Sequence, residues 1–452
     1  MLQLPQPLLS SLEGVPGFDA GALEAAHQQP APVSVRLNRA KPTDVFSTAA
    51  PVPWCPQGRY LDQRPSFTLD PLWHAGAYYV QEASSMLLQW AVEQAIPDRS
   101  GIRALDLCAA PGGKSTLLAS LLPADALLIS NEVIRSRAGI LDENMTRWGY
   151  SNTWVTSNDP ATFASIPGYF DLMVVDAPCS GSGLFRKDPD ALNEWSENAV
   201  KLCAARQQRI LADAWPSLKE GGVLVYATCS YSPEEDEAIL DWLLEDLGAE
   251  SIELNPPAGW GVTATRSPLR QAIGFRCYPD KVRGEGFFIA VLRKTDSTKD
   301  IAPLRWRTAH EHGTFGSVAP WLAAGEWTCL RTSKTDYSVV KASQQEDWHR
   351  LRNALYFRKL GLPVGSLAGS DLIPDYALAM SVDLSDTVAS AELDLEAALR
   401  YLKGEDPGLE EGIRGWHVAR YQGIGLGWMK ALNSRINNYL PKNLRIRRNI
   451  EK

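Results

Sequence analysis

The fold is decided by the stretch Leu105-Asp106-Leu107-Cys108-Ala109-Ala110-Pro111-Gly112-Gly113-Lys114-Ser115, which reads as a strand, a glycine turn and a helix start. Gly112 and Gly113 lack a Cβ, so the chain can turn tightly and its backbone can approach a ligand. The N-terminus of the following helix favours negative groups. A phosphate-binding loop would need glycine in place of Cys108. We therefore expect S-adenosylmethionine, whose carboxylate can sit on such backbone amides.

Strand and helix patterns alternate on both sides of this turn. Apolar strand patterns cover residues 103–107, 126–132, 153–156, 170–176 and 222–228, and helical patterns cover 114–122, 134–148, 196–219 and 233–247. This alternation predicts an α/β fold with a parallel, doubly wound sheet of the Rossmann-like kind. A further apolar run, 285–293, is expected to close the sheet as its last strand.

The chain has 452 residues, too many for one core, so we expect several domains. Residues 1–75 are rich in proline and aromatics, with a strand at 33–38, and predict a small α+β accessory domain. Residues 76–295 form the main domain, which opens with a helix over 82–95. After a polar linker, residues 301–452 form a C-terminal extension with a helix near 345–360 and a strand through 415–421.

Composition and charge exclude several classes of protein. Seven cysteines without any C-x-x-C pair, and a start without a signal-peptide pattern, favour reduced thiols in the cytoplasm. No apolar run approaches the roughly 20 residues of a membrane span. The net charge of -8 argues against nonspecific coating of nucleic acid, although local patches can still bind phosphates.

The C-terminal tail has the opposite charge from the rest of the chain. Its basic residues over 430–452 are Lys430, Arg435, Lys442, Arg445, Arg447, Arg448 and Lys452, against the single acid Glu451. This polarity predicts contact with a polyanion. The plain alternative is a tail that is merely solvated.

Two acids follow predicted strands where a cofactor would lie. Glu132 ends the second strand, where α/β folds place a carboxylate that accepts the ribose hydroxyls. Asp159 follows the third strand and could accept the adenine amino group. Because Asn158-Asp159-Pro160 is also turn chemistry, Asp159 has the alternative role of a helix cap or turn residue.

Two cysteine-bearing turns also follow strands: Asp176-Ala177-Pro178-Cys179-Ser180-Gly181 and Thr228-Cys229-Ser230. Methylation of cytosine carbon 5 needs a thiolate at carbon 6, because only then is carbon 5 nucleophilic enough to attack a sulfonium methyl group. Cys179 and Cys229 both have the polar strand-end position that such a thiol needs. Asp176 could hold the cytosine edge through N4 and N3. Cys108 lies within the glycine turn, where a small residue facing the cofactor is expected.

These motifs resemble those of the bacterial RNA cytosine-C5 methyltransferases of the Sun or Fmu kind, most closely the RsmF branch, which modifies 16S ribosomal RNA. The resemblance rests on CAAPGGKS at 108–115, Glu132, Asp159, DAPCSG at 176–181 and ATCSYSPEEDE at 227–237, with an entry segment at 76–85. It implies a class I S-adenosylmethionine fold. The implied cofactor residues are Cys108, Ala109, Ala110, Pro111, Gly112, Gly113, Lys114, Glu132, Asp159 and Asp176.

The resemblance also implies residue roles. The family's nucleophile corresponds to Cys229, and Cys179 assists release of the methylated RNA. DNA cytosine methyltransferases use a Pro-Cys thiol instead, which would point to Cys179, so the nucleophile is assigned by the resemblance. Lys187 matches a basic residue near the target base, although a solvated lysine is an equally good interpretation.

The C-terminal part is similar to an RNA-binding PUA-like module through Gly425-Leu426-Gly427-Trp428 and Asn438-Tyr439-Leu440-Pro441. We therefore expect a monomeric, metal-free enzyme that forms 5-methylcytosine in ribosomal RNA, within 16S rRNA or the small ribosomal subunit. One alternative is a transfer RNA or other RNA as the substrate. The other is an RNA-binding ribosome assembly factor in which catalysis is vestigial.

Overall fold

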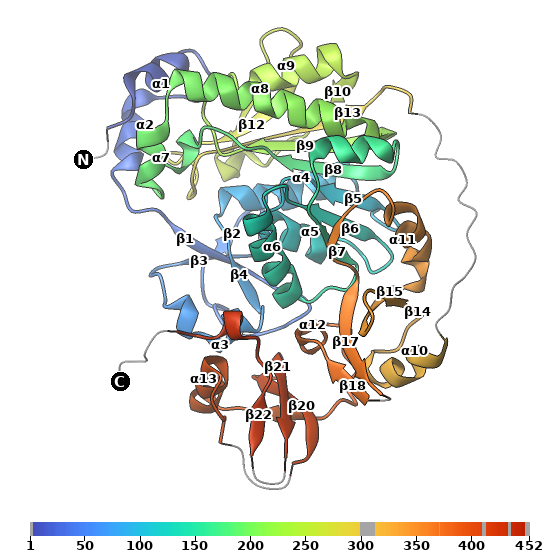
Figure 1. The fold of residues 1–452 in the computed structure, drawn as a ribbon. Helices are drawn as coiled ribbons and strands as arrows, with labels where there is room; N and C mark the ends of the chain where they lie inside the picture. Colours follow the sequence, from blue (N-terminus) through green and yellow to red (C-terminus); the bar gives the residue numbers. More distant parts are fainter. Residues whose placement is uncertain (1–2, 299–311, 370, 409–412, 433–434, 448–452) are drawn as a thin grey trace.

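A mixed β-sheet runs through the middle of the molecule (Figure 1). The computed structural model of the chain describes residues 3–298, 312–369, 371–408, 413–432 and 435–447. The central strands are parallel: β5 (Arg103–Asp106), β6 (Leu127–Asn131), β7 (Thr153–Thr156), β8 (Phe170–Asp176) and β9 (Leu218–Thr228). The order β9-β8-β5-β6-β7 reverses between β5 and β8. Ligands bind at such a switch point, beyond the carboxyl ends of the strands.

Antiparallel strands extend both sides of this parallel centre. On the β9 side lie β13 (Phe287–Lys294), β12 (Ile273–Cys277), β11 (Thr263–Arg266) and β10 (Ala249–Ser251), and on the β7 side lies β16 (Phe357–Lys359). The predicted α/β fold is confirmed, but the sheet is mixed and β13 does not end it. Antiparallel strands can be joined by short turns, whereas parallel strands need a crossover helix. The sheet can therefore continue beyond β13, which runs antiparallel to β9, through further antiparallel strands.

Helices cover both faces of the sheet, as a doubly wound fold requires. One face packs against α4 (Leu87–Ala95), α5 (Gly113–Leu121) and α6 (Arg135–Trp148). The other packs against α8 (Glu197–Ala214) and α9 (Glu237–Asp246). The helix expected over 196–219 ends at Ala214, because Pro216 follows and cannot continue it. The strands are apolar on both faces, which is the pattern of a sheet buried on both sides.

The N-terminal region has two parts that pack in different places. The helices α1 (Gln6–Ser11) and α2 (Ala20–His27) pack against Phe185, Tyr231 and Tyr278 of the main domain. The following strands form a separate sheet of order β2-β3-β1-β4, with β1 (Val33–Leu37), β2 (Pro51–Val52), β3 (Cys55–Leu61) and β4 (Tyr78–Val80). Between β3 and β4 lies α3 (Pro71–His74). The first 83 residues therefore contact the main domain on two sides.

A segment after the main domain adds its own small sheet. Its elements are α10 (His312–Val318), β14 (Trp327–Arg331), β15 (Asp336–Lys341), α11 (Gln345–Leu351), β17 (Leu362–Ala368), β18 (Asp371–Pro374) and α12 (Tyr376–Met380). The helix expected near 345–360 was wrong beyond Leu351, where α11 ends and the chain turns into β16. The exposed edge of β7 offers unpaired backbone groups, and β16 pairs with them while Phe357 packs on Trp154.

The C-terminal module shares a hydrophobic core with the N-terminal sheet. It consists of β19 (Ser390–Glu392), α13 (Leu395–Lys403), β20 (Gly415–Tyr421), β21 (Ile424–Ala431) and β22 (Ile436–Asn438). Val35 and Leu61 of the N-terminal sheet pack in one cluster with Tyr401 and Leu426 of the module. In Figure 1 the two units accordingly lie together below the main sheet.

The strand predicted through 415–421 is confirmed as β20. Of the basic tail residues, Arg448 and Lys452 lie outside the described residues, and the tail's polyanion contact stays a prediction. None of the helices within the described ranges is long and apolar enough to cross a membrane.

Asp347 on α11 attaches the added segment to the main sheet. Its buried Oδ1 accepts hydrogen bonds from Arg103 Nε at 2.7 Å and Tyr169 OH at 2.5 Å. We expect Asp347→Ala to lower the free energy of unfolding by about 3 kcal/mol, because it leaves a part-buried cation and a buried hydroxyl unpaired. Urea denaturation followed by circular dichroism measures this. The neighbouring exposed ion pair provides the control Glu346→Ala, for which a loss below about 1 kcal/mol is expected. Equal losses of unfolding free energy in Asp347→Ala and Glu346→Ala would contradict the role of Asp347 in attaching this segment.

Candidate active site

The loop between β5 and α5 presents its backbone at the carboxyl edge of the sheet. Gly112 has φ +115°, and a Cβ there would lie 3.4 Å from Asn144 and Leu141 on α6. Asn144 Nδ2 donates to the carbonyl of Pro111 at 2.7 Å, and Arg137 Nη2 donates to the carbonyl of Ala110 at 2.8 Å. Helix α6 therefore holds the outer side of the loop. Glycine suits the turn because its backbone is left-handed.

Glu132 lies at the end of β6 and is 3% exposed. Its Oε1 accepts a hydrogen bond from the backbone N–H of Ile134 at 2.9 Å, and its Oε2 lies 3.6 Å from Arg137 Nη1. Directly after it, the apolar side chains of Val133 and Ile134 are 51% and 48% exposed. A carboxylate beside exposed apolar side chains fits the ribose and adenine of S-adenosylmethionine, and the N-terminus of α5 fits its carboxylate.

Asp159 is exposed and caps a short 3-10 helix, Pro160–Ser165. Its Oδ1 accepts the backbone N–H of Ala161 at 3.0 Å. The sequence allowed this capping role as the alternative to an adenine contact. The cap and the contact use different oxygens of one carboxylate, so the adenine contact stays a prediction.

Asp106 is a buried acid that the sequence analysis did not select. It ends β5, and its Oδ2 accepts a hydrogen bond from Ser115 Oγ at 2.6 Å. Its Oδ1 has no hydrogen-bond partner within the described part of the chain. Burial raises the pKa of Asp106 to about 7. A carboxyl group inside an apolar strand was the available signal, since buried charge is rare unless it is functional or paired.

Lys114 forms an ion pair with Asp176, which ends β8, with Nζ and Oδ2 2.8 Å apart. Burial is the largest influence and would lower the pKa of Lys114, but the charge and hydrogen bond of Asp176, together with Cys229 and Asp106, outweigh it and the pKa is raised. The charge of Cys229 also raises the pKa of Lys114, which shows that this thiol lies near the Lys114–Asp176 ion pair. The lysine and the aspartate, predicted for the cofactor site, thus also lie beside the thiols.

The structure brings the two predicted thiols together. Cys179 Sγ and Cys229 Sγ are 3.1 Å apart and both are free and half-buried. This separation is a hydrogen bond, because a disulfide would be about 2.05 Å. The hydrogen bond to Cys229, followed by burial, raises the pKa of the Cys179 thiol well above its usual range. Cys179 therefore keeps its proton at neutral pH.

A buried carboxylate, Glu235, joins the two thiol turns. Its Oε1 accepts the backbone N–H of Ser180 at 2.8 Å, and its Oε2 accepts the hydroxyls of Ser180 at 2.5 Å and Ser230 at 2.6 Å. Gln207 on α8 donates to Glu235 at 3.3 Å and to the carbonyl of Pro178 at 3.1 Å. Burial raises the pKa of Glu235. The residue belongs to the motif at 227–237, but no pattern in that motif indicates its role.

A buried arginine fixes the chain that follows Cys229. Arg276 on β12 donates to both carboxylate oxygens of Glu237 and, through Nη1, to the carbonyl of Tyr231 at 2.7 Å. Its Nη2 lies 3.1 Å from Asp236 Oδ2. The start of α9 is therefore attached to the sheet by charge-assisted hydrogen bonds.

Lys187 has an exposed side chain. Its neighbour Arg186 is buried, pairs with Glu285 at 3.1 Å and donates to the carbonyl of Ala26 on α2 at 3.2 Å. The structure thus positions the lysine beside a fixed arginine, and its proposed role near the base stays a prediction. No group of three or more His, Cys, Asp or Glu side chains within the described ranges could hold a metal ion.

Three family models match the chain. They are 16S rRNA methyltransferase RsmB/F over residues 95–293, the N-terminal domain of 16S rRNA methyltransferase RsmF over 4–83, and the methyltransferase RsmF PUA domain over 388–446. The chain is 33% identical over 416 residues to the ribosomal RNA small subunit methyltransferase F of Aeromonas salmonicida (strain A449), covering 87% of this chain and 84% of that protein. It is 31% identical over 458 residues to the protein of the same name from Serratia proteamaculans (strain 568), covering 93% and 91%.

A solved structure of a methyltransferase homolog protein from Pyrococcus horikoshii is also similar, with a TM-score of 0.53 and 30% identity. It covers 64% of this chain and 100% of that chain. The predicted methyltransferase fold and PUA module are therefore confirmed. The chain belongs to the RsmF family of 16S rRNA methyltransferases, which use S-adenosylmethionine.

Proposed function

We propose that the chain forms 5-methylcytosine in 16S ribosomal RNA through a covalent bond between Cys229 Sγ and carbon 6 of the target cytosine. The observation that carries this proposal is the pair of thiols 3.1 Å apart at the edge where β8 and β9 end, beside the Lys114–Asp176 ion pair. The family supports methyl transfer to ribosomal RNA. Two thiols at one strand edge support attack on a pyrimidine rather than direct methylation of an oxygen or an exocyclic nitrogen.

The environment of the two thiols supports the division of roles. The hydrogen bond between the thiols, followed by burial, raises the pKa of Cys179, and a Cys179 that keeps its proton can donate it to the sulfur of Cys229 when Cys229 attacks. The thiolate is the nucleophile in cysteine chemistry. Lys114 adds a nearby positive charge. We therefore assign attack to Cys229 and the later proton handling to Cys179.

The steps follow from this assignment. Cys229 Sγ bonds to carbon 6, and Asp176 holds the N3 and N4 edge, where charge develops as the ring becomes an enamine. S-adenosylmethionine supplies the electrophilic methyl group that carbon 5 takes up. Loss of the carbon 5 proton then restores the ring double bond and breaks the bond between sulfur and carbon 6. Cys179 stands close enough to Cys229 to assist this release. The base that accepts the proton is left unassigned.

The monomeric state and cytoplasmic location remain predictions from the sequence. The substrate is tested by bisulfite mapping of ribosomal RNA from a strain without this protein, and by methylation of separate 16S, 23S and transfer RNA pools in vitro. We expect a protected cytosine to disappear from 16S rRNA only. Loss from transfer RNA would favour the alternative substrate. Unchanged maps together with no S-adenosylmethionine binding would favour the vestigial assembly factor.

Cys229→Ser is expected to abolish methyl transfer, because oxygen at this position is far less nucleophilic than a thiolate. Cys179→Ala is expected to accumulate a covalent protein–RNA adduct, because attack proceeds while release fails. Both are measured by labelled methyl incorporation and by gel shift under denaturing conditions. An adduct that survives in Cys229→Ser and is absent from Cys179→Ala would reverse the two roles.

Glu235→Gln is expected to lower kcat about tenfold, which corresponds to about 1.4 kcal/mol of barrier. The amide cannot accept from all three Ser180 and Ser230 donors as the carboxylate does, so the two thiol turns lose their alignment. The affinity for S-adenosylmethionine and KM for RNA are expected to stay unchanged. The exposed neighbour supplies the control Glu234→Gln, expected to behave as wild type. If Glu235→Gln raised KM for RNA and left kcat unchanged, Glu235 would not be the residue that aligns the two thiol turns.

A further inference from the structure

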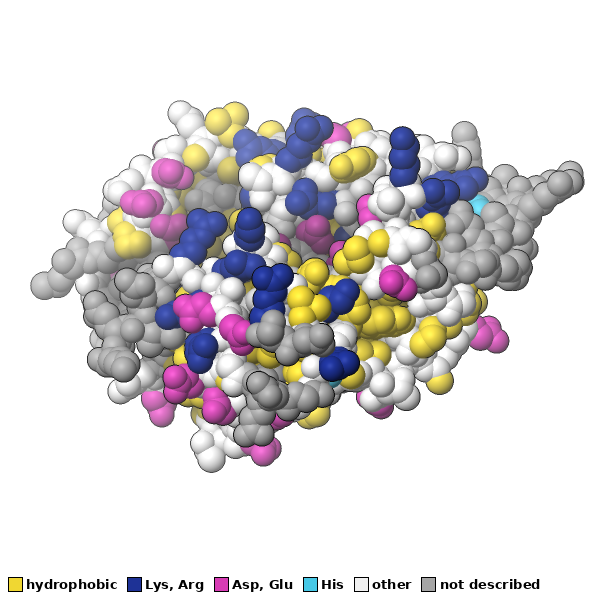
Figure 2. Space-filling model, turned by 60° about the horizontal axis from the view of Figure 1, so that its bottom comes forward, with side chains coloured by type: hydrophobic (Ala, Val, Ile, Leu, Met, Phe, Trp, Pro, Cys, Tyr) yellow, Lys and Arg dark blue, Asp and Glu magenta, His cyan; other side chains and the backbone are white. Residues whose placement is uncertain are grey.

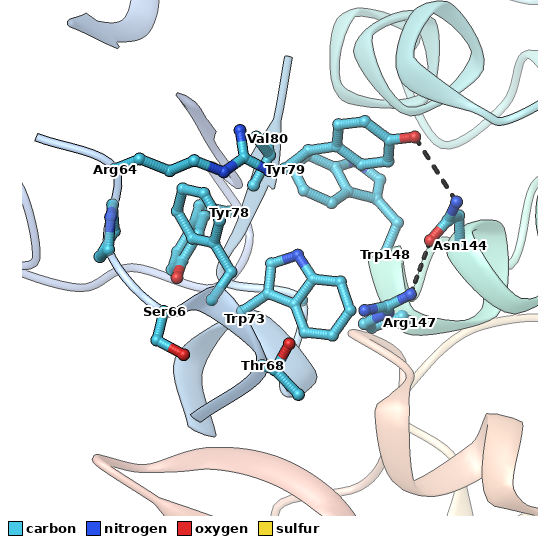
Figure 3. Close-up of a pocket in the computed structure, with 13 residues that line it drawn as sticks. Arg64, Ser66, Thr68, Trp73, Tyr78, Tyr79, Val80, Asn144, Arg147 and Trp148 are labelled. Carbon is cyan, nitrogen blue, oxygen red and sulfur yellow. Dashed lines mark hydrogen bonds between the residues drawn. The ribbon is translucent and has the colours of Figure 1, made fainter. Parts of the chain in front are cut away.

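A pocket of about 480 Å³ lies between the N-terminal sheet and helix α6, outside the site described above. Figure 3 shows that its walls come from two separate regions of the chain. Residues 64–80, which include α3 and β4, supply one wall, and the second half of α6 supplies the other. The volume falls within the roughly 300–1,000 Å³ of small-molecule sites.

Aromatic side chains dominate this pocket. Trp73 and Tyr79 are half-buried, whereas Phe67, Tyr78 and Trp148 are buried behind them. Such rings give flat, apolar surfaces on which a nucleobase stacks, and this kind of binding tolerates different bases.

Two arginines complete the lining. The guanidinium of Arg147 lies 4.1 Å from the centre of the Trp73 ring, and that of Arg64 lies 5.4 Å from the centre of the Phe67 ring. Figure 3 shows the two arginines reaching the pocket from opposite sides, with Trp73 between them. Within the described ranges neither arginine forms an ion pair with a carboxylate. Their charge is therefore available to an anionic ligand.

The pocket is connected to the cofactor loop by shared residues. A Cβ on Gly113 would lie 3.6 Å from the Tyr79 ring, and Asn144, which lines the pocket, donates to the carbonyl of Pro111 at 2.7 Å. A ligand in the pocket thus lies directly beside the loop that carries the cofactor. Figure 2 shows many Lys and Arg side chains, with scattered acids between them, on the face that lies at the bottom of Figure 1.

We propose that this pocket binds a single-stranded nucleotide of the RNA substrate other than the target cytosine, stacking its base on Trp73 and Tyr79 and contacting its phosphate through Arg64 and Arg147. This inference rests on the proposed function for the identity of the RNA. Arg147 Nη2 donates to Asn144 Oδ1 at 2.6 Å, but neither arginine has a carboxylate partner within the described ranges. Rings together with such arginines suit a nucleotide, which is flat and apolar at one end and anionic at the other. If the pocket bound a segment of another protein instead, that segment would not require two arginines without carboxylate partners.

The experiment measures binding of full-length protein to 16S rRNA and to a short labelled single-stranded RNA by filter binding and anisotropy across salt concentrations. We expect Trp73→Leu to weaken the Kd about tenfold through lost stacking. Arg64→Ala is expected to weaken binding and to reduce the slope of log Kd against log salt by about 0.7, the value for one phosphate on a single strand. Arg64→Lys, which keeps the charge, is expected to restore the slope.

Matched controls lie far from the pocket. Arg293→Ala removes a half-exposed arginine near the C-terminal end of β13. Trp242→Leu removes a half-buried tryptophan on α9. Both are expected to bind RNA as wild type does. The thermal midpoint and the S-adenosylmethionine affinity of each variant report whether it is folded. Because the Arg64 side chain is exposed, Arg64→Ala is expected to stay folded. The proposal can therefore be tested with Arg64→Ala even if Trp73→Leu unfolds.

Wild-type RNA affinity and salt slope in Arg64→Ala would overturn the proposal, as would losses matched by the two controls. Methylation by the wild-type protein is measured in parallel. If wild type forms no 5-methylcytosine, the proposed function fails, while the binding comparison still decides whether the pocket holds a nucleotide. If wild type methylates and the pocket variants bind normally, only the pocket inference fails.

Discussion

The arrangement of the site depends on one buried carboxylate, that of Glu235. Two loops follow neighbouring strands β8 and β9, and nothing in the strand pairing alone requires their thiols to meet. Glu235 accepts three hydrogen bonds that draw the Ser180 and Ser230 turns together, and Gln207 donates a fourth. An unpaired charge at this depth would cost several kcal/mol, so the donors are what make the burial tolerable. The contact between the thiols is a consequence of this network.

The N-terminal sheet and the C-terminal module are also fixed by buried contacts. The N-terminal sheet and the C-terminal module bury their apolar faces against each other in one core, instead of forming separate modules on linkers. Arg36 on β1 reaches into the main domain, where its Nη2 donates to Thr116 Oγ1 on α5 at 2.6 Å. The surfaces of the N-terminal sheet and the C-terminal module are therefore held at a fixed distance from the loop between β5 and α5, and under the proposed function such rigidity favours recognition of one preformed RNA shape.

Much of the core could be predicted because its signals are local. The strands at 103–107 and 170–176 are apolar runs followed by glycine or proline turns, and a parallel sheet brings the carboxyl ends of such strands to one edge. The sequence analysis expects Cys179, Cys229 and Asp176 at one edge for this reason, and the structure places the two thiols 3.1 Å apart. The helix expected over 345–360 failed because β16 is stabilised by pairing with β7, a partner about 200 residues earlier. Glu235 and Arg276 act through contacts between distant segments, which leave no periodic mark in the sequence.

The thiols themselves have an asymmetry that the sequence could not supply. Both cysteines occupy the same kind of position, after a strand and within a polar turn, so the sequence pattern does not distinguish them. In the folded protein the hydrogen bond with Cys229, followed by burial, raises the pKa of Cys179, so this thiol keeps its proton. The charge on Lys114 is close to Cys229 and is itself held by Asp176. The fold thus raises the pKa of Cys179 and gives Cys229 a nearby positive charge on Lys114, and this difference supports the assignment of attack to Cys229 within a pair that looks equivalent in sequence.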